Sequence, residues 1–335
     1  MLFQPAIIAL LLAAGLGVLM LALATPFALQ VIRHWDIHSG SEYQLLLERR
    51  TYLFSTLATF VLVAQLAALL LFVFTADRLA AMFVGAMCAV GTLNVNPWGF
   101  PALILQMLAF FLAAAWLAIN HVDSAARDYP LVRIKYALLI LLLPFLVASF
   151  WLQFNFFSEL KANVITSCCG SMFSSEATTI VSDLSGLPPQ PALWLFYGAL
   201  SAAIALALGH ALRRGRSSGA LLALFSAVAF VAAMSGVLSF LSLYIYEHPH
   251  HHCPFCILKP EYDYRGYALY LPLFIATAAG LGAGAIQPFA HRPSLRHIAP
   301  RVTGRLAALA ATGFLLFAAI ATWFILASNL ILIEH

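Results

Sequence analysis

Eight long apolar runs divide the sequence, and they constrain the fold more than any other feature. Each run holds about 20 residues or more, the length that an α-helix needs to cross the hydrocarbon core of a membrane. Lipid offers the backbone no hydrogen-bonding partners, so such runs cross a membrane as helices. The runs cover residues 5–32, 52–76, 100–120, 136–157, 192–212, 219–246, 267–289 and 305–331.

The composition agrees with this interpretation. Hydrophobic residues make up 63% of the 335-residue chain and charged residues only 9%, whereas a soluble domain carries about 25% charged residues. The net charge of +4 comes from basic residues scattered through short loops, which argues against a nucleic-acid partner. The first run is too long for a signal peptide and has no basic start. We therefore expect an all-α, polytopic transmembrane bundle whose first helix is not cleaved.

A ninth apolar segment, residues 79–94, is ambiguous. It is short and contains Gly85, Cys88 and Gly91. If it crosses the membrane, the chain has nine spans and the loop 33–51 lies outside. If it is re-entrant, the chain has eight spans and that loop, with its three arginines, lies inside. The length of the segment favours nine spans, and the count of basic residues favours eight.

Basic residues predict the orientation of the other loops. The loops 121–135, 213–216 and 290–305 together hold ten of the seventeen Lys and Arg residues, whereas the loops 158–191 and 247–266 hold three. Basic loops stay on the cytoplasmic side of a membrane. We therefore expect a multi-pass protein of the inner (cytoplasmic) membrane, with the loops 158–191 and 247–266 on the outer, periplasmic side.

Four of the five cysteines lie in these two outer loops. Cys168 and Cys169 are adjacent, and Cys253-Pro-Phe-Cys256 is a CxxC motif. Two thiols at CxxC spacing can close a disulfide, and a disulfide between adjacent cysteines is strained and therefore easily reduced. The sequence predicts a catalytic set of these four residues, with Cys253 attacking and Cys256 resolving. A permanent staple between the loops is the alternative.

Four histidines precede the CxxC motif and give it a second interpretation. A solvated loop is the simpler one, in which protonated histidines would lower the thiol pKa. The other is a site for a soft metal such as Cu(I) or Zn(II), which suits nitrogen and sulfur ligands. The predicted ligand set is His248, His250, His251, His252, Cys253 and Cys256.

Cys88 stands apart from the other cysteines, inside the segment 79–94. A small apolar cysteine packed in a core is the simpler interpretation. The alternative is a soft ligand along a metal path, near Asn94 and Asn96.

The order of helices and cysteines over residues 136–289 resembles that of the vitamin K epoxide reductases and, more loosely, of the DsbB-type quinone reductases. That resemblance implies a four-helix core with outward cysteine loops at 136–289, preceded by helices in 1–135 and followed by a basic loop and last helix in 290–335. It also implies a quinone beside Cys253 and Cys256, and a shuttle role for Cys168 and Cys169 toward a soluble thiol partner. The polar stretch 259–265 and the adjacency of Cys168 and Cys169 depart from the family pattern.

Three functions follow as hypotheses. The first is thiol–disulfide exchange between a membrane electron carrier, such as a quinone, and a periplasmic thioredoxin-like partner. The second is binding or transport of a soft, copper-like metal. The third is a membrane anchor subunit of a larger complex, with stapled loops.

Overall fold

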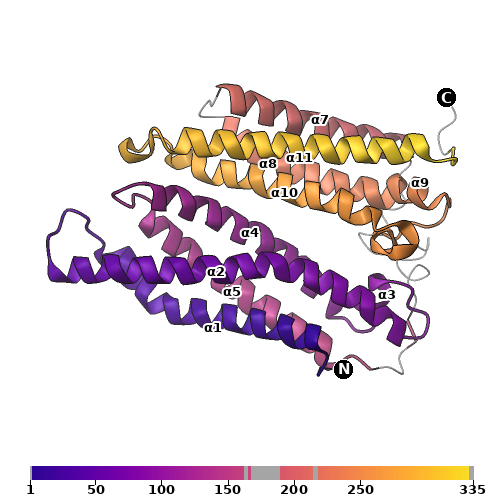
Figure 1. The fold of residues 1–335 in the computed structure, drawn as a ribbon, viewed down its shortest axis with the longest axis horizontal. Helices are drawn as coiled ribbons and strands as arrows, with labels where there is room; N and C mark the ends of the chain where they lie inside the picture. The colour runs from indigo at the N-terminus through magenta and orange to yellow at the C-terminus, as the bar shows by residue number, and fades with distance from the viewer. Residues whose placement is uncertain (1, 162–164, 167–188, 214–217, 332–335) are drawn as a thin grey trace. The chain divides into compact units, whose positions relative to one another are not determined.

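The computed structural model describes residues 2–161, 165–166, 189–213 and 218–331. In this part of the chain, eight helices are long and apolar enough to cross a membrane, at the places where the apolar runs predict them (Figure 1). The expected all-α, polytopic class is therefore confirmed. The helices are α1 (Pro5–His34), α2 (Glu42–Leu79), α4 (Gly99–Ala125), α5 (Val132–Ser158), α7 (Pro189–Arg213), α8 (Ser218–Gly236), which continues through η2 (Val237–Leu241) into α9 (Ser242–Tyr246), α10 (Arg265–Ile286) and α11 (Ala299–Ala327).

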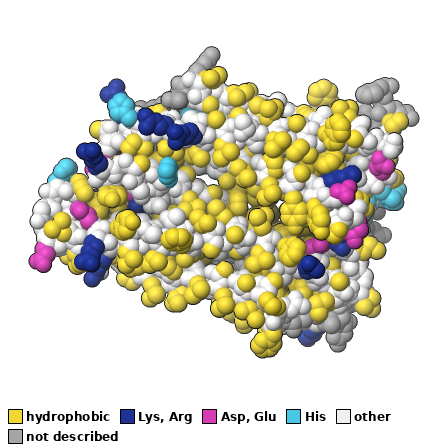
Figure 2. All heavy atoms as spheres, in the orientation of Figure 1, with side chains coloured by type: hydrophobic (Ala, Val, Ile, Leu, Met, Phe, Trp, Pro, Cys, Tyr) yellow, Lys and Arg dark blue, Asp and Glu magenta, His cyan; other side chains and the backbone are white. Residues whose placement is uncertain are grey.

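Hydrophobic side chains cover much of the surface between the ends of these helices, and charged side chains gather toward the ends (Figure 2). Among the exposed apolar side chains, Leu23 is 66% exposed and Phe60 71% exposed. Such faces are costly in water and suited to lipid. The surface thus agrees with a bilayer around the helices.

The chain forms two compact units, each assembled from separate stretches of sequence. The first contains residues 1–75, 96–161 and 285–302, and the second contains residues 76–95, 162–284 and 303–335. In this division α5 groups with α1, α2 and α4, and the expected segments 1–135, 136–289 and 290–335 stay a prediction.

The first unit packs α1, α2, α4 and α5 around a buried apolar core (Figure 1). Trp116 of α4 is 1% exposed and packs with Leu21, Leu62 and Leu139 from the other three helices. The Trp116 indole N–H donates to the carbonyl oxygen of Lys135 at 2.8 Å, so this large side chain is buried without losing its hydrogen bond.

The basic loops of this unit lie at one end of it. Arg133 donates to the carbonyl oxygen of Trp35, and Arg292 donates to the carbonyl oxygen of Pro130. The loops 35–41, 126–131 and 287–298 therefore meet. At the other end, Trp98 at the start of α4 donates to Glu159 after α5 at 2.9 Å.

This arrangement decides between eight and nine spans. The loop after α1 lies beside the α4–α5 loop, so the chain crosses an even number of times between them. Residues 80–95 accordingly form two short pieces, η1 (Ala80–Met82) and α3 (Ala89–Leu93). A five-residue helix rises only about 7.5 Å, too little to cross a bilayer. Of the two alternatives, the described residues agree with eight spans, because the segment turns near Gly85 and does not continue as one helix.

One residue counted as a loop charge is buried instead. Lys135 is 1% exposed and its ammonium lies 2.7 Å from the carboxylate of Asp123, which is 0% exposed. Asn120 accepts a further hydrogen bond from Lys135, and Asp123 accepts one from the backbone N–H of Leu131. Removing either ion would leave the other charged and buried without its partner, at a cost of roughly 3–5 kcal/mol. The pair fixes the turn between α4 and α5.

The second unit packs α7, α8 with η2 and α9, α10 and α11 (Figure 1). Phe196 of α7 lies at its centre, with the rings of Phe240 and Phe317 at 5.4 and 5.6 Å. Small residues bring α10 against α8. A Cβ atom at Gly280 would lie 2.0 Å from the hydroxyl oxygen of Ser226, so only glycine permits this approach. The glycines of α10 serve helix packing, as the sequence indicates.

The eight-span topology predicts which loops share a face of the membrane. We expect cysteines placed at His38 and Arg127 to react with a membrane-impermeant maleimide from the same face, and one placed at Lys161 to react from the opposite face. Each substitution is made with Cys168→Ser and Cys169→Ser to remove background labelling. Joint labelling of the His38 and Lys161 positions from one face would contradict eight spans.

Candidate functional site: a buried three-cysteine cluster

The CxxC motif lies in irregular backbone between α9 and α10. Helix α9 ends at Tyr246, and the capping residue Glu247 has a left-handed backbone with φ of 52°. The Glu247 carboxylate accepts hydrogen bonds from the backbone N–H and the side-chain amide of Asn329, which ties the start of this loop to the end of α11. The loop then forms two single turns, η3 (Cys256–Leu258) and η4 (Pro260–Tyr262).

Two tyrosines hold the backbone of the motif. The Tyr246 hydroxyl donates to the carbonyl oxygen of Cys253, and the Tyr270 hydroxyl donates to the carbonyl oxygen of Pro254 at 2.7 Å. Cys256 follows as the first residue of η3. With its backbone fixed in this way, the motif keeps Cys253 at 0% and Cys256 at 5% exposure.

Cys88 comes to the site from the segment between η1 and α3, which is held by Thr166. The backbone N–H of Thr166 donates to the carbonyl oxygen of Val84 at 3.0 Å. The Thr166 hydroxyl donates to the carbonyl oxygen of Gly91 at 2.9 Å. Gly85 has φ of +85°, and a Cβ atom there would lie 2.1 Å from the Thr166 carbonyl oxygen. Glycine is therefore required at this turn. Cys88 itself is fully buried.

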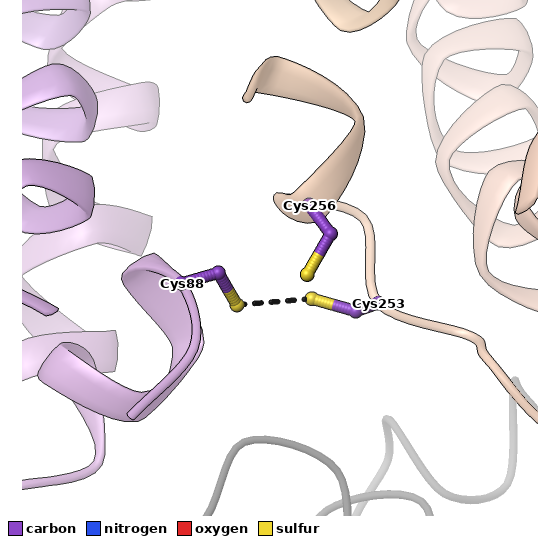
Figure 3. A group of neighbouring side chains, drawn as sticks. All are labelled: Cys88, Cys253 and Cys256. Atoms are coloured by element: carbon purple, nitrogen blue, oxygen red, sulfur yellow. Dashed lines mark hydrogen bonds between the residues drawn. The ribbon is translucent and has the colours of Figure 1, made fainter. Parts of the chain in front are cut away.

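These elements bring three sulfur atoms together (Figure 3). The sulfurs of Cys88, Cys253 and Cys256 all lie within 4.8 Å of one another, and those of Cys88 and Cys253 are 3.3 Å apart. All three residues belong to the second unit, and all are thiols and not disulfides. Cys253 is the central thiol, since it makes side-chain hydrogen bonds to both Cys256 and Cys88.

The surroundings keep the central thiol protonated. A hydrogen bond to Cys256 raises the pKa of Cys253 well above its ordinary value of 9.0, burial raises it further, and the hydrogen bond from Cys88 lowers it in part. The expectation that neighbouring histidines lower this pKa is wrong. Burial lowers the pKa of His251, and repulsion from His248 and His252 lowers it again, so His251 is neutral near pH 7 and supplies no charge to stabilise a thiolate.

The histidines have structural contacts of their own. The His251 ring stacks on the Tyr246 ring at 4.0 Å. The ring nitrogen Nδ1 of His252 lies 2.8 Å from the carbonyl oxygen of Leu238; because a carbonyl only accepts, Nδ1 carries the proton. Leu238 lies in η2, a π-helical turn, where the wider winding frees carbonyl groups from the helix. His252 thereby anchors the loop to the preceding helix.

The structure thus groups some of the predicted site residues and not others. Cys253 and Cys256 lie together as expected. Within the described residues, the group that includes them and could hold a metal ion contains no histidine and takes Cys88 as its third member. Cys168 and Cys169 lie outside the described residues, so their predicted exchange with Cys253 and Cys256 stays a prediction. The sequence feature that sets Cys88 apart is its place in a short apolar segment interrupted by Gly85 and Gly91.

Comparison of the chain with protein-family models, with curated proteins and with solved structures finds no match.

The raised pKa predicts how Cys253 reacts with alkylating reagents. We expect its alkylation rate to keep rising as the pH passes 9.0, the ordinary pKa of a thiol, because the reactive thiolate forms only above the raised pKa. A cysteine placed at the exposed His38 is the control, and its rate should level off near that pH. Rates by mass spectrometry check this, in a chain with Cys88, Cys168 and Cys169 replaced by serine. A Cys253 rate that levels off below about pH 8 would show an activated thiolate instead.

Proposed function

We propose that this membrane protein carries out thiol–disulfide exchange, with Cys253 and Cys256 as the pair that is oxidised and reduced. The observation that supports this best is the placement of three buried thiols within 4.8 Å. A disulfide carries no charge, so a buried dithiol can be oxidised at little electrostatic cost, whereas a buried thiolate is disfavoured.

The protonated state of Cys253 indicates the kind of electron acceptor. Because Cys253 holds its hydrogen near pH 7, closing the Cys253–Cys256 bond releases two electrons together with two protons. A quinone takes up two of each to become a quinol, and a partner disulfide takes up two of each to become two thiols. In the reverse direction, two thiols of a partner give their hydrogens to the Cys253–Cys256 disulfide and become a disulfide themselves.

Burial favours an order of reaction opposite to the one expected from other CxxC pairs. Cys256 is 5% exposed and Cys253 is fully buried, so a partner sulfur reaches Cys256 first and Cys253 then resolves the mixed disulfide. Cys168 and Cys169 would serve this step as a shuttle, since Thr166, two residues before Cys168 in the sequence, is held beside the Cys88 segment.

The basic loops suggest an orientation. Helix α10 starts at the CxxC loop and ends at the basic loop 287–298, so these two loops lie on opposite sides of a bilayer about 30 Å thick. With the basic loops on the cytoplasmic side of an inner membrane, the cysteine cluster faces the periplasm. Maleimide labelling of the His38 position from the cytoplasmic face supports this orientation, and labelling from the periplasmic face contradicts it.

The proposal predicts a reversible two-electron transition of the purified protein. In glutathione buffers of graded potential, followed by acid quenching and alkylation, we expect Cys253 and Cys256 to change together from thiols to a disulfide. The variants Cys253→Ser and Cys256→Ser should lose this transition, and also the turnover of a soluble thiol donor with a short-chain quinone, because one sulfur cannot close the bond. Cys168→Ser with Cys169→Ser should keep the transition and lose turnover with the thiol donor.

Two results would argue against exchange. Cys253 and Cys256 that remain alkylatable at every potential would exclude it. A bond to Cys168 or Cys169 that resists reduction would identify a staple, as expected of an anchor subunit.

Binding of a soft metal is the second candidate, favoured by the same three sulfurs. Thiolates are preferred ligands of Cu(I) and bind Zn(II) well. The cluster excludes water, and a cation there could displace the thiol protons and neutralise the charge that they leave. The ligand set is Cys88, Cys253 and Cys256, in place of the predicted set with histidines.

The metal candidate predicts one Cu(I) per chain under anaerobic conditions, measured by competition with a chromogenic Cu(I) chelator. Serine at position 88, 253 or 256 should weaken binding by at least about tenfold, since one ligand is lost. His248→Asn and His250→Asn are matched controls from the same loop and should bind as the unaltered chain does. Binding by the three serine variants that is as tight as binding by the unaltered chain would exclude this site.

A further inference from the structure

We infer that Cys88 is a third redox thiol, which takes over the disulfide from the CxxC pair by attacking Cys253. This inference rests on the proposed exchange function, because that function supplies the Cys253–Cys256 disulfide. It assigns a chemical role to a residue in a different part of the sequence, 165 positions before Cys253.

The geometry already places the reacting atoms in contact. The Cys88 and Cys253 sulfurs are 3.3 Å apart, and a disulfide needs them at about 2.05 Å. The two sulfurs therefore have to approach each other by about 1.25 Å. Cys253 is hydrogen-bonded to Cys88 on one side and to Cys256 on the other, so it can exchange one sulfur partner for the other while its backbone stays anchored by Tyr246.

The step is balanced without any external oxidant. The Cys88 sulfur attacks Cys253 and forms the Cys88–Cys253 bond as the Cys253–Cys256 bond breaks. The hydrogen lost by Cys88 goes to Cys256, which leaves as a thiol. No electron enters or leaves, so the reaction is an isomerisation of one disulfide into another.

The surrounding structure holds Cys88 for this step. Thr166 fixes the segment on both sides of Cys88 through its bonds to Val84 and Gly91, and Gly85 allows the close approach. A cysteine that served only to fill a core would not need its segment to be bonded to Thr166, a residue from a distant part of the sequence. Cys256 is the most exposed of the three at 5%, whereas Cys88 and Cys253 are both fully buried, and Cys253 bonds to each of the other two.

Disulfide mapping of the full-length protein tests the inference. Cys168→Ser and Cys169→Ser are combined with Cys256→Ser, with Cys88→Ser or with Cys253→Ser, so that one pair of the cluster remains in each protein. Each protein is oxidised with diamide, quenched with acid, alkylated and analysed by mass spectrometry, which separates a link between two peptides from one within the CxxC peptide.

We expect the Cys256→Ser protein to form the Cys88–Cys253 link at a rate within about tenfold of the Cys253–Cys256 bond in the Cys88→Ser protein, since the sulfurs are already in contact. The Cys253→Ser protein, which lacks the central sulfur, should oxidise more slowly than both. With all three cysteines present, the ratio of the two disulfides should not change with diamide concentration, because their interconversion consumes no oxidant. The Cys88→Ala variant should form the Cys253–Cys256 bond at the same rate as the Cys88→Ser variant, which shows that the result does not depend on the serine hydroxyl.

The possible failures are distinguishable. If Cys88→Ser and Cys88→Ala oxidise but Cys256→Ser leaves Cys88 and Cys253 fully alkylatable, Cys88 is not a redox thiol and the exchange function stands. If the ratio of the two disulfides varies with diamide, the bonds form independently and the isomerisation is wrong. If no pair oxidises in any protein, the exchange function fails and the inference fails with it.

Discussion

The inability of lipid to hydrogen-bond the backbone is the constraint on which the rest of this structure depends. Inside a bilayer every N–H and C=O group needs a partner in the protein, and a helix supplies all of them within one segment. The eight long helices satisfy this requirement, and irregular backbone is left to their ends. The chemistry of the chain follows the same division, because the CxxC motif and Cys88 both lie in short turns next to long helices.

Irregular backbone can take many conformations, but its N–H and C=O groups lack the hydrogen bonds that a helix would supply. At the cysteine cluster such hydrogen bonds come from tyrosines of the neighbouring helices and from Thr166, which lies outside the helices. Tyr246 and Tyr270 bind carbonyl oxygens of the CxxC motif, and Thr166 binds two carbonyl oxygens around Cys88. The thiols themselves are left to interact with one another, in surroundings that disfavour charge. A neutral product such as a disulfide, or a cation that cancels thiolate charge, suits such a place better than a permanently activated nucleophile.

Much of the fold could be predicted from the sequence, because an apolar run of about 20 residues has few other uses. The sequence predicted the bounds of the helices and the burial of residues at their ends less well. Helix α2 begins at Glu42, ten residues before its apolar run, since charged residues can continue a helix outside the hydrocarbon core. Lys135 was counted as a loop charge, yet it is buried against Asp123. No local pattern distinguishes a solvated lysine from one whose partner lies twelve positions away.

The cluster could be predicted only in part. The CxxC spacing indicates that Cys253 and Cys256 are neighbours, but nothing in the sequence around Cys88 points to a partner 165 positions away. That contact depends on the turn at Gly85 and on Thr166, neither of which follows a helical or strand periodicity. For the histidines, proximity in sequence suggested shared ligands. The His251 ring packs on Tyr246 and His252 bonds to Leu238, and a ligand role for the histidines stays a prediction.

The separation of Cys88 and Cys253 in the sequence also determines the order in which the cysteines are synthesised. A ribosome adding about 5–20 residues per second needs roughly 10–30 s to extend the chain from the first of these cysteines to the second. Disulfides form in seconds to hours, so Cys88 emerges early enough to be captured by Cys168 or Cys169, which are made before its partners. The cluster is therefore completed only after Cys253 and Cys256 are made, and on the proposed exchange function a bond formed earlier at Cys88 has to be exchanged before Cys88 can pair with Cys253.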